Sequence, residues 1–292
     1  MRISAKIMTD HIKANLTRQS EQLMETQLRL SSGKRINKPS DDPIGIGKVL
    51  DYRTTLETVD QYGANITDAK TRIEFTESVL GQVSEFIEDA KKIATVSNVD
   101  DRSGLAQEIR NIRQQVFGLA NTKYGANYLF AGHLSDTTPF DPVFPYDYHG
   151  DDGSHRVIVG EGITIPIDAD GGQMFSDDHG DTLFRILDEL ETALTDDPYD
   201  PTAVRRSVDA LYQIADRVKA TRGGLASNYK RLERTDAYWK NFSNAVESMR
   251  QRVEDADMTQ TALDMQVQQT AYEVLLATAA RVIQPSLIDF LR

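Results

Sequence analysis

Residues 44–96 of this 292-residue chain read IGIGKVLDYRTTLETVDQYGANITDAKTRIEFTESVLGQVSEFIEDAKKIATV. Apolar residues recur there every seven positions, and a second row falls three residues after members of the first. The first row is Tyr52, Val59, Ile66, Ile73, Leu80, Ile87 and Ala94, and the second is Tyr62, Ala69, Val83 and Ala90. This spacing, kept over so many heptads, predicts a coiled-coil helix about 80 Å long. A helix of that length needs a partner helix, because a small globular core cannot surround it.

The partner is predicted near the other end of the chain, as one long helix over residues 202–283. Its first row is Leu211, Val218, Leu225, Leu232, Trp239, Val246 and Val253, and its companion row is Ile214, Phe242, Met249 and Ala256. The seam is expected to continue through Leu263, Val267, Val274 and Ala277. Gln284-Pro285-Ser286 is expected to end the helix. The two long helices should therefore pair antiparallel.

Shorter elements are predicted between and before the long helices. Helical spacing covers residues 8–30, 105–121 and 182–194. Between them, residues 130–181 are rich in Gly, Asp and Pro and contain two short strand patterns, Arg156–Val159 and Gly162–Ile167. The predicted fold is mainly α, an elongated antiparallel coiled-coil rod with a small β-rich inserted domain.

The connector before the long helix contains residues that end the first helix and residues that begin the long one. Gly33 is the expected C-cap of the first helix. Ser40 or Asp41 is expected to cap the long helix, with Pro43 in its first turn. The first helix itself has a weak apolar stripe, because Gln19 and Thr26 fall at seam positions. Its partner is therefore expected to lie in another molecule or to be absent in the free chain.

Composition and charge exclude several classes of function. The net charge is −12, and residues 130–200 hold 17 acidic against two basic residues, a net charge of −15. No basic stripe with interleaved aromatic residues indicates nucleic-acid binding. The chain has no Cys, hence no disulfide or thiolate zinc site. It has no apolar run long enough for a membrane span and no signal-peptide core, which by itself favours a cytoplasmic protein.

No catalytic or cofactor-binding constellation is recognisable. The sequence contains no HExxH, no complete EF-hand loop and no phosphate-binding Gly-Lys-Ser/Thr. Four of the five histidines lie among the aspartates of the insertion, where solvated loop residues are favoured over a metal site. The histidines are His11, His133, His149, His155 and His179. We therefore expect no catalytic residue, no cofactor and no metal, and an enzyme is the least favoured class.

Two motifs resemble a known family. Residues 31–43, SSGKRINKPSDDP, closely resemble the N-terminal signature of bacterial flagellins, and residues 252–258, RVEDADM, resemble the matching C-terminal segment. The resemblance covers about the first 130 and the last 110 residues. Within the family, NYLFAG at 127–132, TPFD at 138–141 and PSLIDFL at 285–291 are similar to the hook-associated protein 3 branch.

The resemblance implies a structural protein at the junction between flagellar hook and filament. It implies export, unfolded, through the flagellar type III route without a cleaved signal peptide, and hence an extracellular location on the flagellum. It also implies an export chaperone as a partner, then copies of the chain in a ring, with hook-associated protein 1 and filament flagellin as neighbours. A short filament flagellin and a coiled-coil binding or signalling module remain as alternatives.

Together, pattern and resemblance divide the chain into five parts. Residues 1–43 and 255–292 are the assembly segments, expected to be disordered in the free monomer because isolated helices are marginal without burial. Residues 44–129 and 182–254 form the rod, and 130–181 the insertion. The residues expected at the assembly interface are Met8, Ile12, Leu16, Leu23, Leu30, Leu263, Val267, Val274, Leu287 and Phe290.

Overall fold

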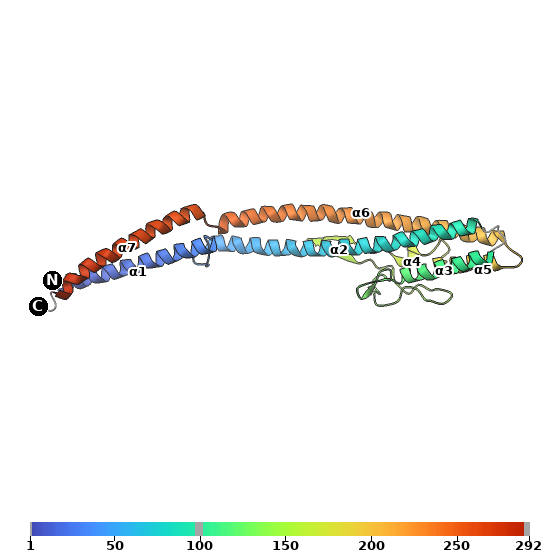
Figure 1. Cartoon of the computed structure of the whole chain (residues 1–292), viewed down its shortest axis with the longest axis horizontal. Helices are drawn as coiled ribbons and strands as arrows, with labels where there is room; N and C mark the ends of the chain where they lie inside the picture. The colour runs from blue at the N-terminus through green and yellow to red at the C-terminus, as the bar shows by residue number, and fades with distance from the viewer. Residues whose placement is uncertain (1, 97–101, 289–292) are drawn as a thin grey trace. The chain divides into compact units, whose positions relative to one another are not determined.

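The computed structural model describes residues 2–96 and 102–288, and the side chains of residues 7–96 and 102–281. Over these ranges the chain is mainly α-helical, as predicted, with two small antiparallel hairpins (Figure 1). The helices are α1 (Arg2–Ser32), α2 (Pro43–Thr95), α3 (Arg102–Ala120), α4 (Gly171–Met174), α5 (Leu183–Thr195), α6 (Pro201–Glu254) and α7 (Met258–Ile288). The strands are β1 (Lys123–Tyr124), β2 (Asn127–Tyr128), β3 (Arg156–Gly160) and β4 (Ile163–Pro166).

The chain divides into two compact units, residues 2–58 with 241–288 and residues 59–240. Inside the second unit, α2 and α6 run antiparallel. The rings of Tyr62 and Trp239 have centroids 5.2 Å apart. Further along α2, Lys91 Nζ lies 3.9 Å from the ring centroid of Tyr212. As the residue number of the contact rises along α2, from 62 to 91, the residue number of its partner in α6 falls, from 239 to 212. This confirms the predicted antiparallel pairing in this unit.

The predicted heptad rows form the seam of this pair. In α2 the buried members are Val59, Ile66, Ala69, Ile73, Leu80, Val83, Ile87, Ala90 and Ala94, and in α6 they are Leu211, Ile214, Val218, Leu225 and Leu232. The companion row of α6 fails at Met249, in the first unit, which is exposed. The apolar spacing therefore identified the seam correctly along the second unit.

The predicted strands pair as the hairpin β3–β4, with Arg156 opposite Pro166. Two side chains from the long helices donate hydrogen bonds to backbone carbonyls of β3. Asn65 Nδ2 donates to the carbonyl of Ile158 at 2.9 Å, and Trp239 Nε1 donates to that of Val159 at 2.7 Å. The hairpin is thus fixed to both long helices by hydrogen bonds. The smaller hairpin, β1–β2, was not predicted.

The rest of the insertion packs with α3 and α5, which lie side by side (Figure 1). Four buried aromatic rings, Phe130, Phe140, Phe175 and Phe184, contact one another there at centroid distances of 5.0 to 6.2 Å. Because aromatic side chains bury a large apolar area, these rings give the insertion a core continuous with the helical seam.

The prediction of one helix over residues 202–283 is wrong. The chain leaves the helix after Glu254 and begins α7 at Met258. Asp257 caps the new helix, since its Oδ1 accepts the backbone N–H groups of Thr259 and Gln260 at 2.9 and 3.1 Å. The expected end at 284–286 is also wrong, because α7 runs to Ile288.

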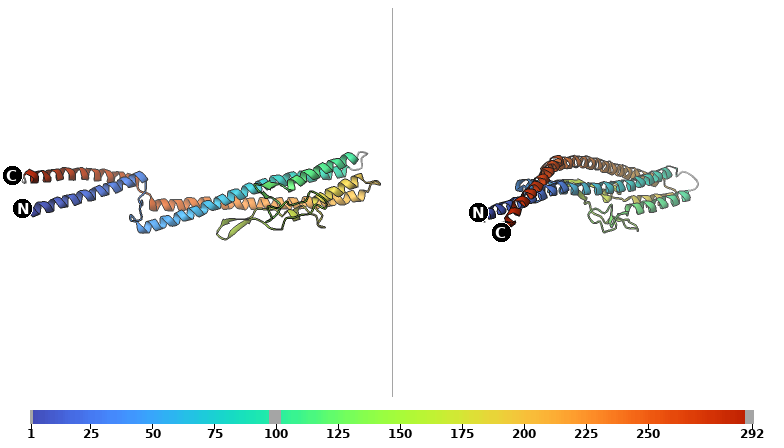
Figure 2. Two further views of the ribbon diagram at one scale, coloured as in Figure 1. Left: turned by 90° about the horizontal axis from the view of Figure 1, so that it is seen from below. Right: turned by 60° about the vertical axis from the view of Figure 1, so that its left-hand side comes forward.

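In the first unit α1 and α7 pack against each other as an antiparallel pair (Figure 2). The partner of α1, expected to lie in another molecule or to be absent in the free chain, is therefore present in the same chain. Gly33 ends α1 as predicted, with a φ of 70° and its N–H donated to the carbonyl of Arg29 at 2.9 Å. No described helix combines the length and the apolar composition that a membrane span requires.

Candidate assembly interface

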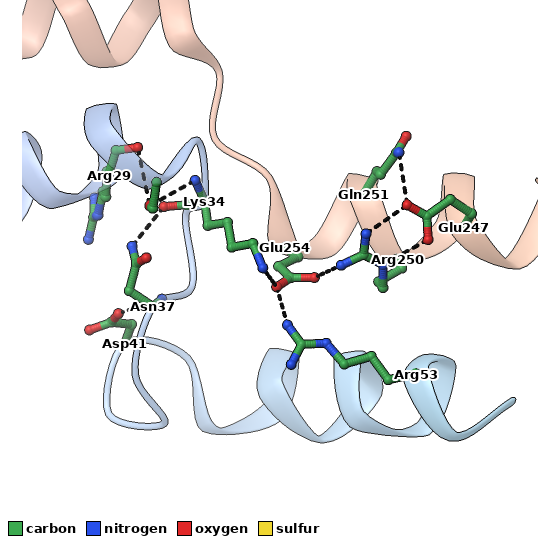
Figure 3. A network of polar contacts seen from close by, with 10 residues as sticks. Arg29, Lys34, Asn37, Asp41, Arg53, Glu247, Arg250, Gln251 and Glu254 are labelled. Atoms are coloured by element: carbon green, nitrogen blue, oxygen red, sulfur yellow. Dashed lines mark hydrogen bonds and ion pairs between the residues drawn. The ribbon is translucent and has the colours of Figure 1, made fainter. Parts of the chain in front are cut away.

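The two family motifs meet in the first unit, where the connector between α1 and α2 lies on the turn between α6 and α7 (Figure 3). Ala256 donates its backbone N–H to the carbonyl of Gly33 at 2.9 Å. The N–H groups of Arg35 and Ile36 donate to the carbonyl of Glu254 at 2.7 and 3.3 Å. The Arg35 guanidinium donates to the carbonyl of Val253 at 2.8 Å. Residues far apart in the sequence thus form one backbone-bonded junction.

Glu254 is the charged centre of this junction. It is 1% exposed, and its carboxylate pairs with Lys34 Nζ at 2.7 Å, with Arg53 Nη2 at 2.5 Å and with Arg250 (Figure 3). Burial by itself raises the pKa of a carboxyl group, but the hydrogen bonds from Lys34 and Arg53 outweigh it and lower the pKa of Glu254. The carboxylate is therefore held in its charged form.

Arg250 links this centre to the preceding turn of α6. Its Nε and Nη2 donate to the two carboxylate oxygens of Glu247 at 2.9 and 2.7 Å, while Nη1 pairs with Glu254. The bonds to Glu247, with the charge of Glu254, raise the pKa of Arg250 against the opposing effect of burial. Arg250 stays protonated and acts as a fixed cation beside Glu254.

The two aspartates of the connector have separate roles. Asp42 caps α2, since its Oδ1 accepts the N–H of Gly45 at 2.8 Å; this bond and the Arg35 guanidinium lower its pKa. Asp41 instead accepts the N–H groups of Asn37 and Lys38, each at 3.0 Å, and these bonds lower its pKa despite burial. The expected cap at Ser40 or Asp41 is wrong by one or two residues, while Pro43 lies in the first turn as predicted and is the first residue of α2.

On α1, most of the predicted interface residues belong to the face that packs in the helix pair. Half-buried or buried positions recur there in steps of three and four residues: Thr9, Ile12, Leu16, Gln19, Leu23, Thr26 and Leu30. The buried Thr26 hydroxyl donates to the carbonyl of Gln22 at 3.0 Å. Met8 lies outside this face and is exposed. The polar seam positions are therefore tolerated but add little apolar burial.

On α7 the predicted seam points away from the pair. Leu263, Val267 and Val274 are 54%, 68% and 60% exposed, and Ala277 is exposed too. The packed face is instead Thr261, Met265, Gln268, Tyr272, Leu275 and Ala279. As a continuation of the intramolecular seam the predicted row is wrong, because the turn after Glu254 resets the helical phase. The side chain of Leu287 and all of Phe290 lie outside the described residues.

No reaction chemistry is evident on the described residues. His155 and Arg72 both bond the buried carboxylate of Asp168, the latter at 2.9 Å, and this tethers the insertion to α2. Over the parts of the chain that the structure describes, no three His, Asp or Glu side chains are placed to hold a metal ion.

Known flagellar proteins are similar to this chain in sequence. The sequence profile of the bacterial flagellin N-terminal helical region matches residues 3–135. Flagellar hook-associated protein 3 of Salmonella typhimurium is 34% identical to the chain over 182 residues. That alignment covers 60% of this chain and 57% of the relative, little more than half its length. The Escherichia coli protein of the same name is 27% identical over 298 residues, 94% of each chain.

A solved structure shares the fold. The flagellar junction protein FlgL of Legionella pneumophila superposes with a TM-score of 0.61 at 12% identity, over 71% of this chain and 99% of that one. At that identity the likeness speaks for the fold alone. The chain is therefore similar to bacterial flagellins over residues 3–135 and, over longer stretches, to proteins named flagellar hook-associated protein 3.

Proposed function

We propose that this chain is a structural protein of the bacterial flagellum that forms the junction between hook and filament. It has no enzymatic role and assembles through its terminal helices. It reaches the cell exterior through the flagellar type III route without a cleaved signal peptide. Support comes from the relatives of Salmonella and Escherichia coli, which are named flagellar hook-associated protein 3.

The observation that carries the assembly role is the apolar row on the outer face of α7. Leu263, Val267 and Val274 recur at helical spacing and leave most of their surface in water. An apolar row of this kind on a paired helix is typical of a surface that another chain covers. Burying it contributes about 25 cal/mol per Å² of apolar area, and the contributions add over repeated contacts.

The proposed partners follow from this role. Copies of the chain form a ring, and the α7 row of each copy packs on its neighbour. Hook-associated protein 1 and filament flagellin are the proposed neighbours along the axis, and an export chaperone binds the terminal segments before secretion. Proteins named flagellin are also similar to the chain, one from Halalkalibacterium halodurans at 24% identity over 253 residues. A short filament flagellin is therefore the second candidate.

Deletion of the gene in its source bacterium tests the proposal. Electron microscopy would show the surface appendages, and an assay of the medium would measure secreted flagellin. The junction role predicts hooks without filaments and flagellin leaking into the medium. Loss of filaments without leaked subunits would instead support the filament flagellin, and normal filaments would contradict both.

A further inference from the structure

The break between α6 and α7 has no local sequence cause of the usual kind. Residues 251–262 read QRVEDADMTQTA, with neither Gly nor Pro. Helices end locally at such residues, whereas Glu, Ala, Met and Gln favour helix and Asp is tolerated. Asp257 can begin a helix as its cap, but an aspartate does not by itself end the preceding one. The cause of the break lies outside residues 251–262.

The connector takes the hydrogen bonds that a continuous helix would need. In an unbroken helix the N–H groups of residues 256, 257 and 258 would donate to the carbonyls of residues 252, 253 and 254. Here the N–H of Ala256 donates to Gly33, and the carbonyls of Val253 and Glu254 accept from Arg35 and Ile36. Residues 33–36 therefore compete directly with helix continuation at three successive positions.

The Glu254 side chain anchors the connector in this position. Lys34 binds its carboxylate from the connector itself, at 2.7 Å, and Arg53 binds it from α2, at 2.5 Å. Lys34 also forms an antiparallel bridge with Asp255. Without this carboxylate, Lys34, Arg53 and Arg250 lose a shared partner, and the connector loses its charged contact with the turn.

The apolar spacing fits the unbroken helix. The α6 row ends with Val246 and Val253, and Val267 and Val274 lie at multiples of seven residues beyond them. In one continuous helix these four side chains share a face. In the broken form Val246 is buried, whereas Val267 and Val274 are exposed. The sequence thus carries the pattern of a helix that the structure interrupts.

We propose that residues 255–257 form a two-state junction, which is a turn when residues 33–36 are docked on it and a helical turn joining α6 to α7 when they are not. In the second state α7 continues α6 as one helix, and the row with Val267 and Val274 then lies on the same face as Val246 and Val253. Docking of the connector then decides which face of α7 points outward. This inference does not depend on the flagellar role proposed above.

Distance measurements between two spin labels test the junction. The chain has no Cys, so Ser248→Cys with Gln266→Cys places the labels uniquely at exposed positions of α6 and α7. In one continuous helix these residues are about 27 Å apart, and a second pair, Ser248→Cys with Thr270→Cys, about 33 Å. With Glu254→Ala added, we expect the distances of the unmodified chain to give way to these two values.

Two further variants make the result specific. Glu247→Ala removes the other carboxylate that binds Arg250. Glu247 acts on residues 33–36 only through charge attraction to Lys34, without a hydrogen bond to them, so this variant should leave both distances unchanged. Met258→Pro in the Glu254→Ala chain should restore the unmodified distances. Proline suits the first residue of α7 but cannot continue α6, because it has no N–H to donate to residue 254.

A milder variant covers the case in which Glu254→Ala does not fold. Arg35→Ala removes the guanidinium that donates to the Val253 carbonyl, and the Arg35 side chain is 46% exposed, so folding should be preserved. It should shift the distances in the same direction, for a smaller fraction of molecules. Unchanged distances in every variant whose circular dichroism shows full helix content would overturn the proposal.

Discussion

Glu254 is a buried carboxylate in the first unit that must stay charged to keep its ion pairs. Its pKa is lowered by Lys34 and Arg53, so the ion pairs stabilise the fold above the pKa of the unfolded carboxyl, about 4.3. That stability is lost as the pH falls through the lower folded value. We expect the amides of Arg35 and Ile36, which bond the Glu254 carbonyl, to exchange faster in acid, after correction for intrinsic rates.

Glu254→Gln should remove most of this pH dependence. At pH 7 it should lower the free energy of local opening by about 2–3 kcal/mol, because charged hydrogen bonds are lost in a buried setting. Hydrogen exchange followed by NMR measures both effects. If the variant kept the acid response of the unmodified chain, another group would have to carry it.

Gly45 is required by its close neighbours rather than by its backbone angles. A Cβ there would lie 2.4 Å from Asp42 Oδ2 and 2.7 Å from the Cδ1 of the buried Ile36. Gly45→Ala should therefore disturb the cap of α2 and cost about 1–3 kcal/mol of the free energy of unfolding. Urea unfolding measures the change.

Gly47, in the same helix, is the matched control. A Cβ at this position meets nothing within 4 Å. Gly47→Ala should be neutral or add up to about 1 kcal/mol, because alanine favours helix. Equal effects at both positions would show that crowding at Gly45 is relieved without cost.

At the scale of secondary-structure elements, the hairpin β3–β4 depends on a side chain from α6. Trp239→Phe removes the indole N–H that donates to the Val159 carbonyl at 2.7 Å, and the ring area is largely kept. The loss should cost about 1–3 kcal/mol, measured by urea unfolding, because a carbonyl is left unpaired. Tyr212→Phe, at an exposed ring of the same helix, should change stability by less than about 0.5 kcal/mol. Similar losses in both variants would argue against the tether.

The element boundaries show how far local signals reach. Gly33 and Pro43 mark a helix end and a helix start by backbone chemistry alone. Gly33 was predicted as the C-cap and Pro43 as a first-turn residue, and the structure has both. The end of α6 at Glu254 was missed, because its cause lies more than 200 positions away in the sequence, in the bonds from Arg35 and Ile36. Hydrogen bonds donated by a distant segment cannot be recognised from the residues next to the helix end.

At the scale of the whole molecule, the pair of α1 and α7 should be the first part to open in the free monomer. Its packed faces include polar residues, among them Thr26, Thr261 and Gln268, whose Oε1 is buried without a hydrogen-bond partner. Isolated helices are only marginally stable in water, so α1 and α7 depend on this weakly apolar packing to stay folded. Limited proteolysis followed by mass spectrometry should show first cuts within residues 2–32 and 258–288. Equal resistance along the chain would contradict this.

Assembly should depend on the outer row of α7. Val267→Asp places a charge on a side chain that is 68% exposed, so the monomer should keep its helix content while polymerisation is lost. Gln269→Asp adds the same charge at an exposed polar position of α7 and should assemble normally. Sedimentation together with circular dichroism measures both properties. Normal assembly of the Val267 variant would exclude this row as the contact surface.

The sequence by itself determined the helical class, the heptad seam of the second unit and the two strands β3 and β4. These follow from periodicity, because a repeated apolar spacing defines one face of an element wherever that element lies. Its motifs also resemble those of bacterial flagellins. Only the tertiary structure decided where α6 ends, which face of α7 points outward and that Trp239 bonds a strand. Each of these depends on which of two competing partners a backbone group or side chain takes, and the winning partner lies on a distant segment.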